Sequence, residues 1–158
     1  MTKTNKKNSL GKIADFVEEL QQRNIPKVNE GACVSEILDA FIESNHSRIV
    51  YVVDDQERLK GIISLGNLIR HVFFLYHDTD ISSRHLISMA VSETAKDFML
   101  DKIFFALISD DVESVLKRMI KHNVKEIAII DDEKRIIADL TMIDLLKHYK
   151  NAKGKNLL

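Results

Sequence analysis

The chain has 158 residues, of which 45% are hydrophobic and 30% are charged, and its formal net charge at pH 7 is −1. This length suits one domain with a buried core, and the near-neutral charge argues against nucleic acid or an anionic membrane surface as a partner. Cys33 is the single cysteine, so no internal disulfide can form. With neither a secretory signal nor an apolar run long enough to span a bilayer, the sequence predicts a cytoplasmic protein.

In chain order, the first predicted features are a disordered tail over residues 1–9 and an opening helix over about residues 10–22. The next five elements are an extended segment, an amphipathic helix, two β-branched strands joined by a polar turn, and a helix that begins at a hydroxyl residue. They cover residues 25–28, 34–42, 49–53 and 59–63, and the last element begins at Ser64.

The same five elements return after an interval that we predict to hold a crossover helix near residues 82–91. A second short helix begins at Thr94, whose hydroxyl can cap it while Asp97 reaches back to the backbone. The repeated elements cover residues 104–108, 112–120, 127–130 and 136–140, and the last element begins at Thr141. Each half of the chain therefore has the order β-α-β-β-α.

The two halves are also similar residue by residue, because residues 52–72 align with residues 129–149 without a gap at an offset of 77. A repeated unit needs its partner to bury its apolar face. We therefore predict an α+β fold in which two pseudo-symmetric β-α-β-β-α repeats pack sheet to sheet, with an N-terminal helix and a helical linker between the repeats. The predicted boundaries are a disordered tail (1–9), the first repeat (10–73), the linker (74–93), the second repeat (94–150) and a second disordered tail (151–158).

Each repeat carries the same short motif where its last strand turns into its last helix. The motif reads Gly61-Ile-Ile-Ser64-Leu-Gly-Asn67 in the first repeat and Ala138-Asp-Leu-Thr141-Met-Ile-Asp144 in the second. With two copies of this motif in matching surroundings, the chain resembles a tandem pair of CBS domains, the small modules named after cystathionine β-synthase. The resemblance covers roughly residues 10–150, which leaves no room for an attached enzyme or transporter domain.

The resemblance implies a regulatory module and not an enzyme. Such pairs bind adenine nucleotides in two clefts between the sheets and dimerise into a flat disc. We therefore expect a homodimer that senses AMP, ADP or ATP, with or without Mg²⁺, and that requires no other cofactor. Nucleotide binding would change the angle between the subunits, and an unidentified protein partner would read that change. The alternative is a structural dimerisation or interaction domain whose clefts stay empty.

The resemblance also assigns ligand-binding roles to six residues. Its hydroxyl residue bonds phosphate or ribose, its acid bonds the ribose hydroxyls, and a basic residue that enters the second strand of the unit meets phosphate. These positions are Thr141 and Asp144 in one cleft, Ser64 and Asn67 in the other, and the basic residues Arg48 and Lys125.

Considered without the family, the two hydroxyl residues are expected to be helix caps. Ser64 and Thr141 lie where a strand turns into a helix, and Asp144 completes a capping-box pattern with Thr141. The free amides and the dipole of the same helix end also favour a phosphate, so capping does not exclude ligand binding. A carboxylate can accept both ribose hydroxyls, whereas Asn67 accepts through one uncharged oxygen. We therefore expect the cleft of the first repeat to be the weaker ribose site.

Other site chemistries find little support in the sequence. There is no Gly-rich phosphate loop, no nucleophile elbow and no clustered ligand motif. The acidic pairs at residues 54–55 and 131–132 fall in hairpin turns, where Asp is expected for backbone reasons. The six histidines show no metal-like spacing, so we expect neither a catalytic site nor a metal site.

The second hairpin departs from the first at two strand positions. A turn over residues 131–134 predicts that Glu126 lies opposite Asp139, where the first repeat has Ile49 opposite Ile62. Like charges in a cross-strand pair are destabilising. We expect compensation by a Lys or Arg of the other repeat or subunit, a shared proton or a hard cation, unless both ends face water.

The last helix of each repeat carries more apolar side chains than one compact chain can cover. These side chains are Leu68, Ile69, Val72 and Phe73 in the first repeat and Leu145, Leu146 and Tyr149 in the second. We therefore predict that the homodimer is built on these helices.

Overall fold

The computed structural model describes residues 10–77 and 93–154, so the tail expected over residues 1–9 and the crossover helix expected near residues 82–91 lie outside the described residues. The first repeat consists of β1 (Lys27–Asn29), α2 (Val34–Glu43), β2 (Ile49–Val53), β3 (Leu59–Ser64) and α3 (Leu65–His77). The second consists of β4 (Phe105–Leu107), α6 (Val112–Lys121), β5 (Glu126–Ile130), β6 (Ile136–Thr141) and α7 (Met142–Gly154). Short helices precede them, namely η1 (Ile13–Asp15) and α1 (Val17–Leu20) before the first repeat and α5 (Ala95–Phe98) before the second.

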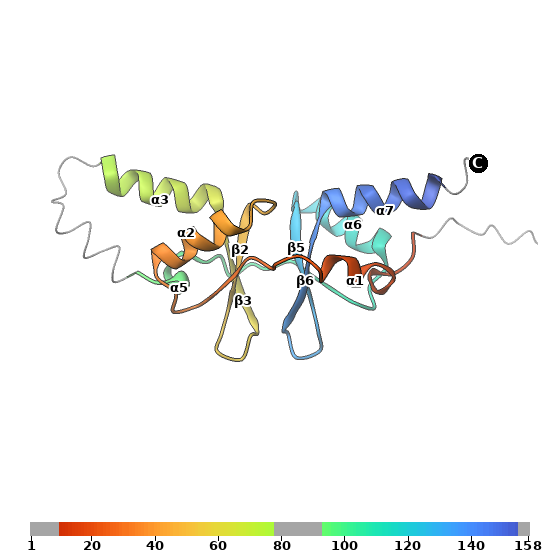
Figure 1. The fold of residues 1–158 in the computed structure, drawn as a ribbon, viewed down its shortest axis with the longest axis horizontal. Helices are drawn as coiled ribbons and strands as arrows, with labels where there is room; N and C mark the ends of the chain where they lie inside the picture. The colour runs from red at the N-terminus through yellow and green to blue at the C-terminus, as the bar shows by residue number, and fades with distance from the viewer. Residues whose placement is uncertain (1–9, 78–92, 155–158) are drawn as a thin grey trace, which may run out of the picture.

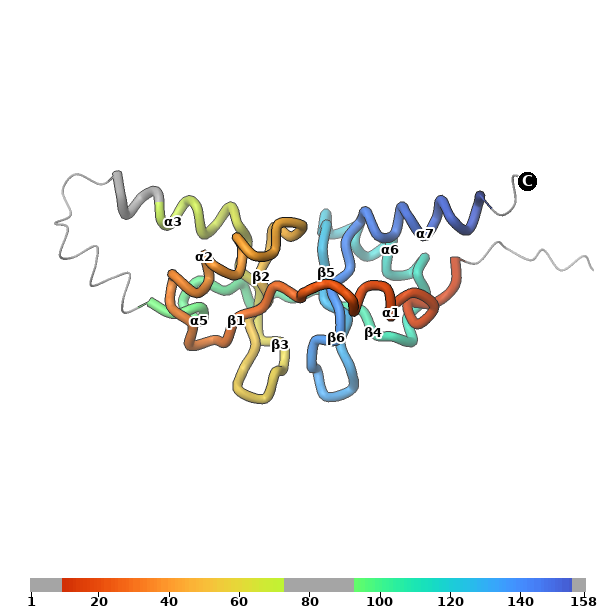
Figure 2. Tube along the Cα trace, in the orientation of Figure 1, coloured from red at the N-terminus to blue at the C-terminus, as the bar shows by residue number. Residues whose placement is uncertain are grey.

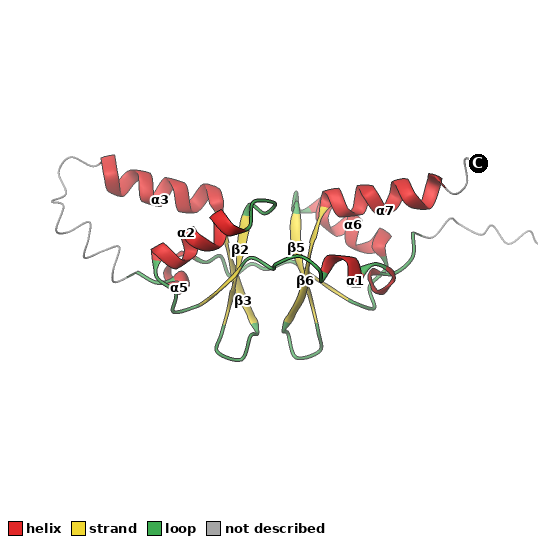
Figure 3. Cartoon of the chain, viewed as in Figure 1, coloured by secondary structure: helices red, strands yellow, loops and turns green. Residues whose placement is uncertain are grey.

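Each repeat forms one three-stranded sheet, and the two sheets face each other at the centre of the molecule (Figure 1). In each sheet the first strand pairs parallel with the second, and the second pairs antiparallel with the third. The longer helices lie on the outer sides of the two sheets (Figure 3). The predicted α+β fold of two pseudo-symmetric repeats packed sheet to sheet is therefore confirmed.

The middle strand β2 is a continuous apolar run, and β5 is apolar after Glu126, because both faces of these strands are covered. On the outer face of β2, Val50 and Val52 pack with Ile37 of α2 in the core of the first repeat. On the inner face, Tyr51 packs with Ala128 of the other sheet. The inner faces of the two middle strands thus form the contact that holds the repeats together.

Each short helix packs on the repeat that lies farther from it along the chain. Phe16 joins the buried core of the second repeat, where the backbone N–H of Ile13 donates to the Asp110 carbonyl at 3.0 Å. Ala95 of α5 joins the core of the first repeat, and its N–H donates to the Ala32 carbonyl at 2.8 Å. Figure 2 shows the stretch between α1 and β1 crossing from the second repeat to the first. The repeats are therefore tied together by exchanged segments as well as by their sheets.

The predicted register of the second hairpin is wrong. A β-bulge between Ile129 and Ile130 shifts the pairing, and the first hairpin has the same irregularity between Val52 and Val53. The observed cross-strand pairs are Glu126 with Thr141, Ala128 with Asp139, and Ile130 with Ile136. The two carboxylates are therefore diagonal neighbours on one face of the sheet and not a directly opposed pair.

The helices extend further than the predicted repeat boundaries. α7 continues to Gly154, past the boundary expected at residue 150, because residues 151–153 contain no helix breaker. α3 runs to His77, inside the segment expected to be linker. Cys33, half-buried, precedes α2 at the N-cap position, where its N–H donates to Glu36. No helix in the described part of the chain is long and apolar enough to cross a membrane.

Candidate functional site

Ser64 and Thr141 cap the helices that follow them, as their positions predict. The Thr141 hydroxyl accepts from the Asp144 N–H at 3.2 Å, and the Asp144 carboxylate accepts from the N–H and the hydroxyl of Thr141 at 2.8 and 2.7 Å. In the first repeat, Ser64 Oγ accepts from the Asn67 N–H at 3.2 Å, while the side chain of Asn67 accepts from Arg70 at 2.5 Å. The capping is therefore reciprocal only in the second repeat.

The motif acid of the second repeat is already bonded to a side chain of this chain. Arg23, in the segment between α1 and β1, donates from Nη1 and Nη2 to the two oxygens of Asp144 at 2.9 and 2.7 Å. Its Nε donates to the Asp139 carboxylate at 3.0 Å, and Nη2 also donates to the Asp139 carbonyl at 2.8 Å. All three guanidinium nitrogens are used in this fork, and neither oxygen of Asp144 is left without a partner.

The same contacts compensate the acidic departure of the second hairpin. The Asp139 side chain is 0% exposed, and besides Arg23 its carboxylate contacts His46 Nε2 at 3.1 Å. Glu126 accepts from the Ser47 hydroxyl and from the Arg48 N–H, the latter at 3.0 Å. Compensation by an Arg that enters the other repeat is thus confirmed for Asp139. Within residues 10–77 and 93–154, no group of His, Cys, Asp and Glu side chains is arranged to hold a metal ion.

The charges of this cluster are fixed by mutual bonding. Burial alone would raise the pKa of Asp144, but the bonds from Arg23 and Thr141 outweigh it and hold the pKa below its ordinary value of 3.8. Burial likewise opposes the charge on Arg23, yet the bonds to Asp144 and Asp139 raise its pKa above the ordinary value. The guanidinium and the Asp144 carboxylate are therefore both ionised at neutral pH.

Asp144 makes the unfolding free energy of the protein depend on pH. Because its pKa is lower in the folded than in the unfolded state, its contribution is present above about pH 4 and is lost as the pH falls through the folded-state pKa. We expect Asp144→Asn to flatten the dependence of the unfolding free energy on pH between about pH 5 and pH 2, measured by urea denaturation. The same slope in the wild type and in Asp144→Asn would contradict this account.

The equivalent space on the first repeat is an open cleft of about 550 Å³, which we call the first cleft. One wall is the sheet face formed by Ile49, Tyr51 and Ile62, and the other comes from residues of the segments 100–104 and 122–126. Its volume lies in the range of small-molecule sites, about 300–1,000 Å³. We call the space around Asp139 and Asp144, which Arg23 occupies, the second cleft.

The first cleft combines flat apolar walls with charged groups of both signs, since Asp101 and Glu126 line it beside Lys102. The Phe104 ring packs on His122 with ring centroids 4.5 Å apart, and Lys102 Nζ lies 5.7 Å from the Phe104 centroid. Ser64 follows Ile62 by two positions along β3, so both side chains face the same side of the sheet. That side leads to the N-terminus of α3, whose free amides favour an anion. The arrangement suits a flat aromatic ring that carries a phosphate.

Tyr51 is a buried polar group of the first cleft. The residue is 1% exposed, and its hydroxyl has no hydrogen-bond partner among the described residues. Burial, together with the charges of Asp139 and Glu126, raises the pKa of Tyr51 well above its ordinary value, so the hydroxyl stays protonated. Since buried polar groups are nearly always bonded, this hydroxyl is a donor suited to a ligand in the cleft.

Strand pairing brings the predicted site residues together in two sets. The carbonyls of Arg48 and Lys125 each accept from the first amide of the last helix of their own repeat, at 2.9 Å in both cases. Both residues are exposed. One set is Ser64, Asn67 and Arg48 at the start of α3, and the other is Thr141, Asp144 and Lys125 at the start of α7.

The sequence prediction missed Arg23 and Tyr51. Arg23 aligns with Asp101 at an offset of 78, the offset of α2 and α6, so the charge is reversed between the repeats. This reversal, beside the change of Ile62 to Asp139, was the available signal. Tyr51 was hidden because an apolar strand context gives no sign that a hydroxyl is unpaired.

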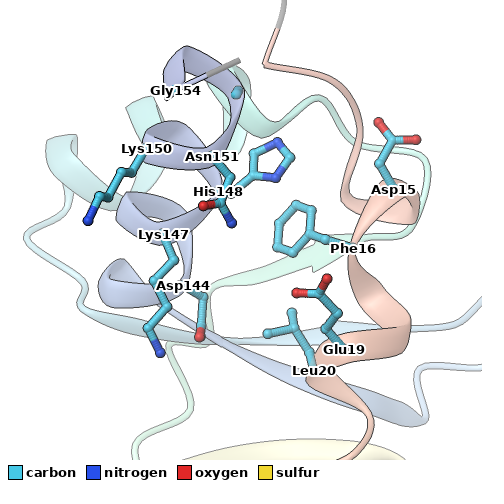
Figure 4. Close-up of a pocket in the computed structure, with 11 residues that line it drawn as sticks. Asp15, Phe16, Glu19, Leu20, Asp144, Lys147, His148, Lys150, Asn151 and Gly154 are labelled. Carbon is cyan, nitrogen blue, oxygen red and sulfur yellow. The ribbon is translucent and has the colours of Figure 1, made fainter. Parts of the chain in front are cut away.

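A larger groove, about 750 Å³, lies outside the sheets between the opening segment and α7 (Figure 4). His148 stacks on Phe16 across it, with centroids 4.7 Å apart, and His148 Nε2 lies 2.6 Å from the Leu10 carbonyl. Lys150 extends away from the opening segment in Figure 4. Asp144 also lines this groove, and the contacts of His148 hold the opening segment against α7.

Two β-α-β-β-α units that face each other with equivalent clefts at their junction define a pseudo-symmetric paired domain. The model of the CBS domain family matches the chain twice, at residues 17–73 and 95–151. The chain therefore belongs to the CBS family and is a tandem CBS pair.

The comparisons extend to whole proteins and solved structures. The chain is 26% identical over 123 residues to the magnesium transporter MgtE of Thermus thermophilus, with 75% of the chain and 23% of that protein covered. The structure of a CBS domain-containing protein from Thermotoga maritima matches with a TM-score of 0.64 and 27% identity over 85% of this chain and 91% of that one. The MgtE cytosolic domain in complex with ATP gives 0.57 and 25% over 77% and 43%. CBSX2 in complex with AMP, 19% identical, gives 0.70 over 90% and 98%.

Proposed function

We propose that this CBS pair is a regulatory module that binds an adenine nucleotide in the first cleft. The observation that carries the proposal is the open cleft of about 550 Å³ with the unpaired, buried Tyr51 hydroxyl in its wall. The complexes of the MgtE cytosolic domain with ATP and of CBSX2 with AMP support an adenine nucleotide as the ligand class.

In this proposal the base lies between the apolar sheet wall and the segment around Phe104. The Tyr51 hydroxyl donates to a ring nitrogen, because its proton is held and an aromatic nitrogen is an acceptor. Ser64 and Arg48 meet phosphate at the start of α3, and Asn67 meets the ribose. Since Asn67 is uncharged and already accepts from Arg70, the ribose contributes less to affinity than the base.

The regulatory step in this proposal is a change of angle between two subunits of a homodimer, read by a protein partner. AMP, ADP and ATP, with or without Mg²⁺, differ in the charge that reaches the start of α3. A ligand shifts the dimer only if it binds one arrangement better than the other. The competing function is structural dimerisation with both clefts empty.

Tyr51→Phe tests the site with a change of one hydroxyl. Losing one hydrogen bond to the ligand is expected to weaken AMP or ATP binding about fivefold to tenfold, measured by calorimetry. Protein stability should not fall, because the deleted hydroxyl has no partner in the described part of the protein. Tyr149→Phe, on the exposed face of α7, is the matched control and should bind as the wild type does.

Two outcomes would count against the proposal. Equal affinity in the wild type and in Tyr51→Phe would show that the base is not bound in the first cleft as proposed. If AMP, ADP and ATP each fail to bind or to raise the melting temperature, with and without Mg²⁺, the structural dimerisation domain is the better account.

A further inference from the structure

The two repeats share one pattern of strands and helices, but the residues that line their two clefts differ. Where the first cleft has Ile62, the second has Asp139, and where the first has Asp101, the second has Arg23. The result is an open cleft in one repeat and a four-bond guanidinium contact in the other.

We infer that the second cleft is built as a guanidinium site that Arg23 fills from within, so that one chain binds one nucleotide. The inference rests on the proposed function for its nucleotide count, but the guanidinium site has a test of its own. Thr141 and Asp144 remain the proposed ligands of a second nucleotide, which can enter only when Arg23 is gone.

The contacts of the Arg23 guanidinium are those of a group bound in a site, and not those of a simple ion pair between surface groups. Arg23 bonds two carboxylates and one backbone carbonyl, and Asp139 is completely buried beneath it. The three nitrogens meet their acceptors at 2.7–3.0 Å, a planar fork that an ammonium group cannot reproduce. Both oxygens of Asp144, which would read a ribose diol, are already bonded to this fork.

Charge excludes a nucleotide from the second cleft even if Arg23 swings out. The Asp139 carboxylate would then keep only its contact to His46, and both Asp139 and Asp144 would stand beside a ligand phosphate without the guanidinium that pairs with them. Opening the second cleft for a nucleotide therefore requires removal of Arg23 together with Asp139. Replacing Asp139 with isoleucine gives the second cleft the residue that the first cleft has in the same place.

Calorimetry with AMP and with ATP tests the count. We expect one nucleotide per wild-type chain and two per chain of Arg23→Ala/Asp139→Ile, with the first affinity unchanged. Adding Asp144→Ala to that double variant should return the count to one. Two nucleotides bound by the wild type, or one by the double variant, would overturn the inference.

Chemical rescue tests the guanidinium site without any nucleotide. Arg23→Ala is expected to melt at a lower temperature, and millimolar methylguanidinium should recover most of that loss while methylammonium should not. Arg135→Ala, which removes a partly exposed Arg–Asp pair, is the matched control and should show no rescue. Equal rescue by both cations, or by neither, would overturn the guanidinium site. If rescue succeeds while no nucleotide binds the wild type, the proposed function fails and the guanidinium site stands.

Discussion

Arg23→Ala is expected to lower the unfolding free energy by about 3–5 kcal/mol, the usual cost of removing one partner of a buried ion pair. The loss is large because Asp139 is 0% exposed and its carboxylate then keeps only the contact to His46. The Asp139 carbonyl and Asp144 lose partners at the same time. Urea denaturation at pH 7 measures the change directly.

Two variants separate the buried charge from general loss of packing. Arg23→Ala/Asp139→Ile removes the stranded carboxylate and should regain most of the lost stability, since apolar replacement of a buried ion pair is often neutral or stabilising. Arg135→Ala should cost at most about 1 kcal/mol, because both side chains of its pair with Asp131 are partly exposed. If Arg23→Ala costs no more than Arg135→Ala, the second cleft does not depend on its guanidinium.

The arrangement of the fold could be predicted because the same pattern of strands and helices occurs twice in the sequence. Apolar periodicity located α2 and α6, and β-branched runs located β2 and β5, since each of these elements must bury a face. The cross-strand register could not be counted from the turns, because a bulge in each hairpin adds a residue that polarity does not reveal. One missed bulge was enough to place Glu126 opposite the wrong residue.

The exchanged short helices and the Arg23 cluster required the structure. The sequence predicted an opening helix and a short helix that begins at Thr94, but not that each packs on the distant repeat. From the sequence alone, Asp144 is equally consistent with a helix cap and with a ribose ligand. Its actual partner Arg23 lies 121 residues away along the chain, and no local pattern connects the two. Sequence reasoning thus predicted the caps at Ser64 and Thr141 but not the guanidinium that occupies the second cleft.

Substitutions in the surface that we propose for the homodimer are expected to have an equally large effect, which is on the oligomeric state. Apolar side chains stand exposed at repeat-equivalent positions on four helices: Ile42 at 75%, Ile69 at 53%, Ile120 at 62% and Leu146 at 66%. Ile42 on α2 is equivalent to Ile120 on α6, and Ile69 on α3 is equivalent to Leu146 on α7. α3 and α7 run along one edge of the molecule, on either side of its centre, at the top of Figure 1. A second copy related by a two-fold axis would cover both patches at once.

Light scattering of the wild type at micromolar concentration is therefore expected to give twice the chain mass. Ile69→Glu/Leu146→Glu places a charge in each half of the interface, where a desolvated and unpaired carboxylate is strongly unfavourable, and should give a monomer with unchanged circular dichroism. Ile108→Glu alters another exposed isoleucine, in the loop after β4, and should remain dimeric. A monomeric wild type would refute the homodimer. A dimer that survives both glutamates would place its interface elsewhere, and the change of angle between subunits would then need a different pair of helices.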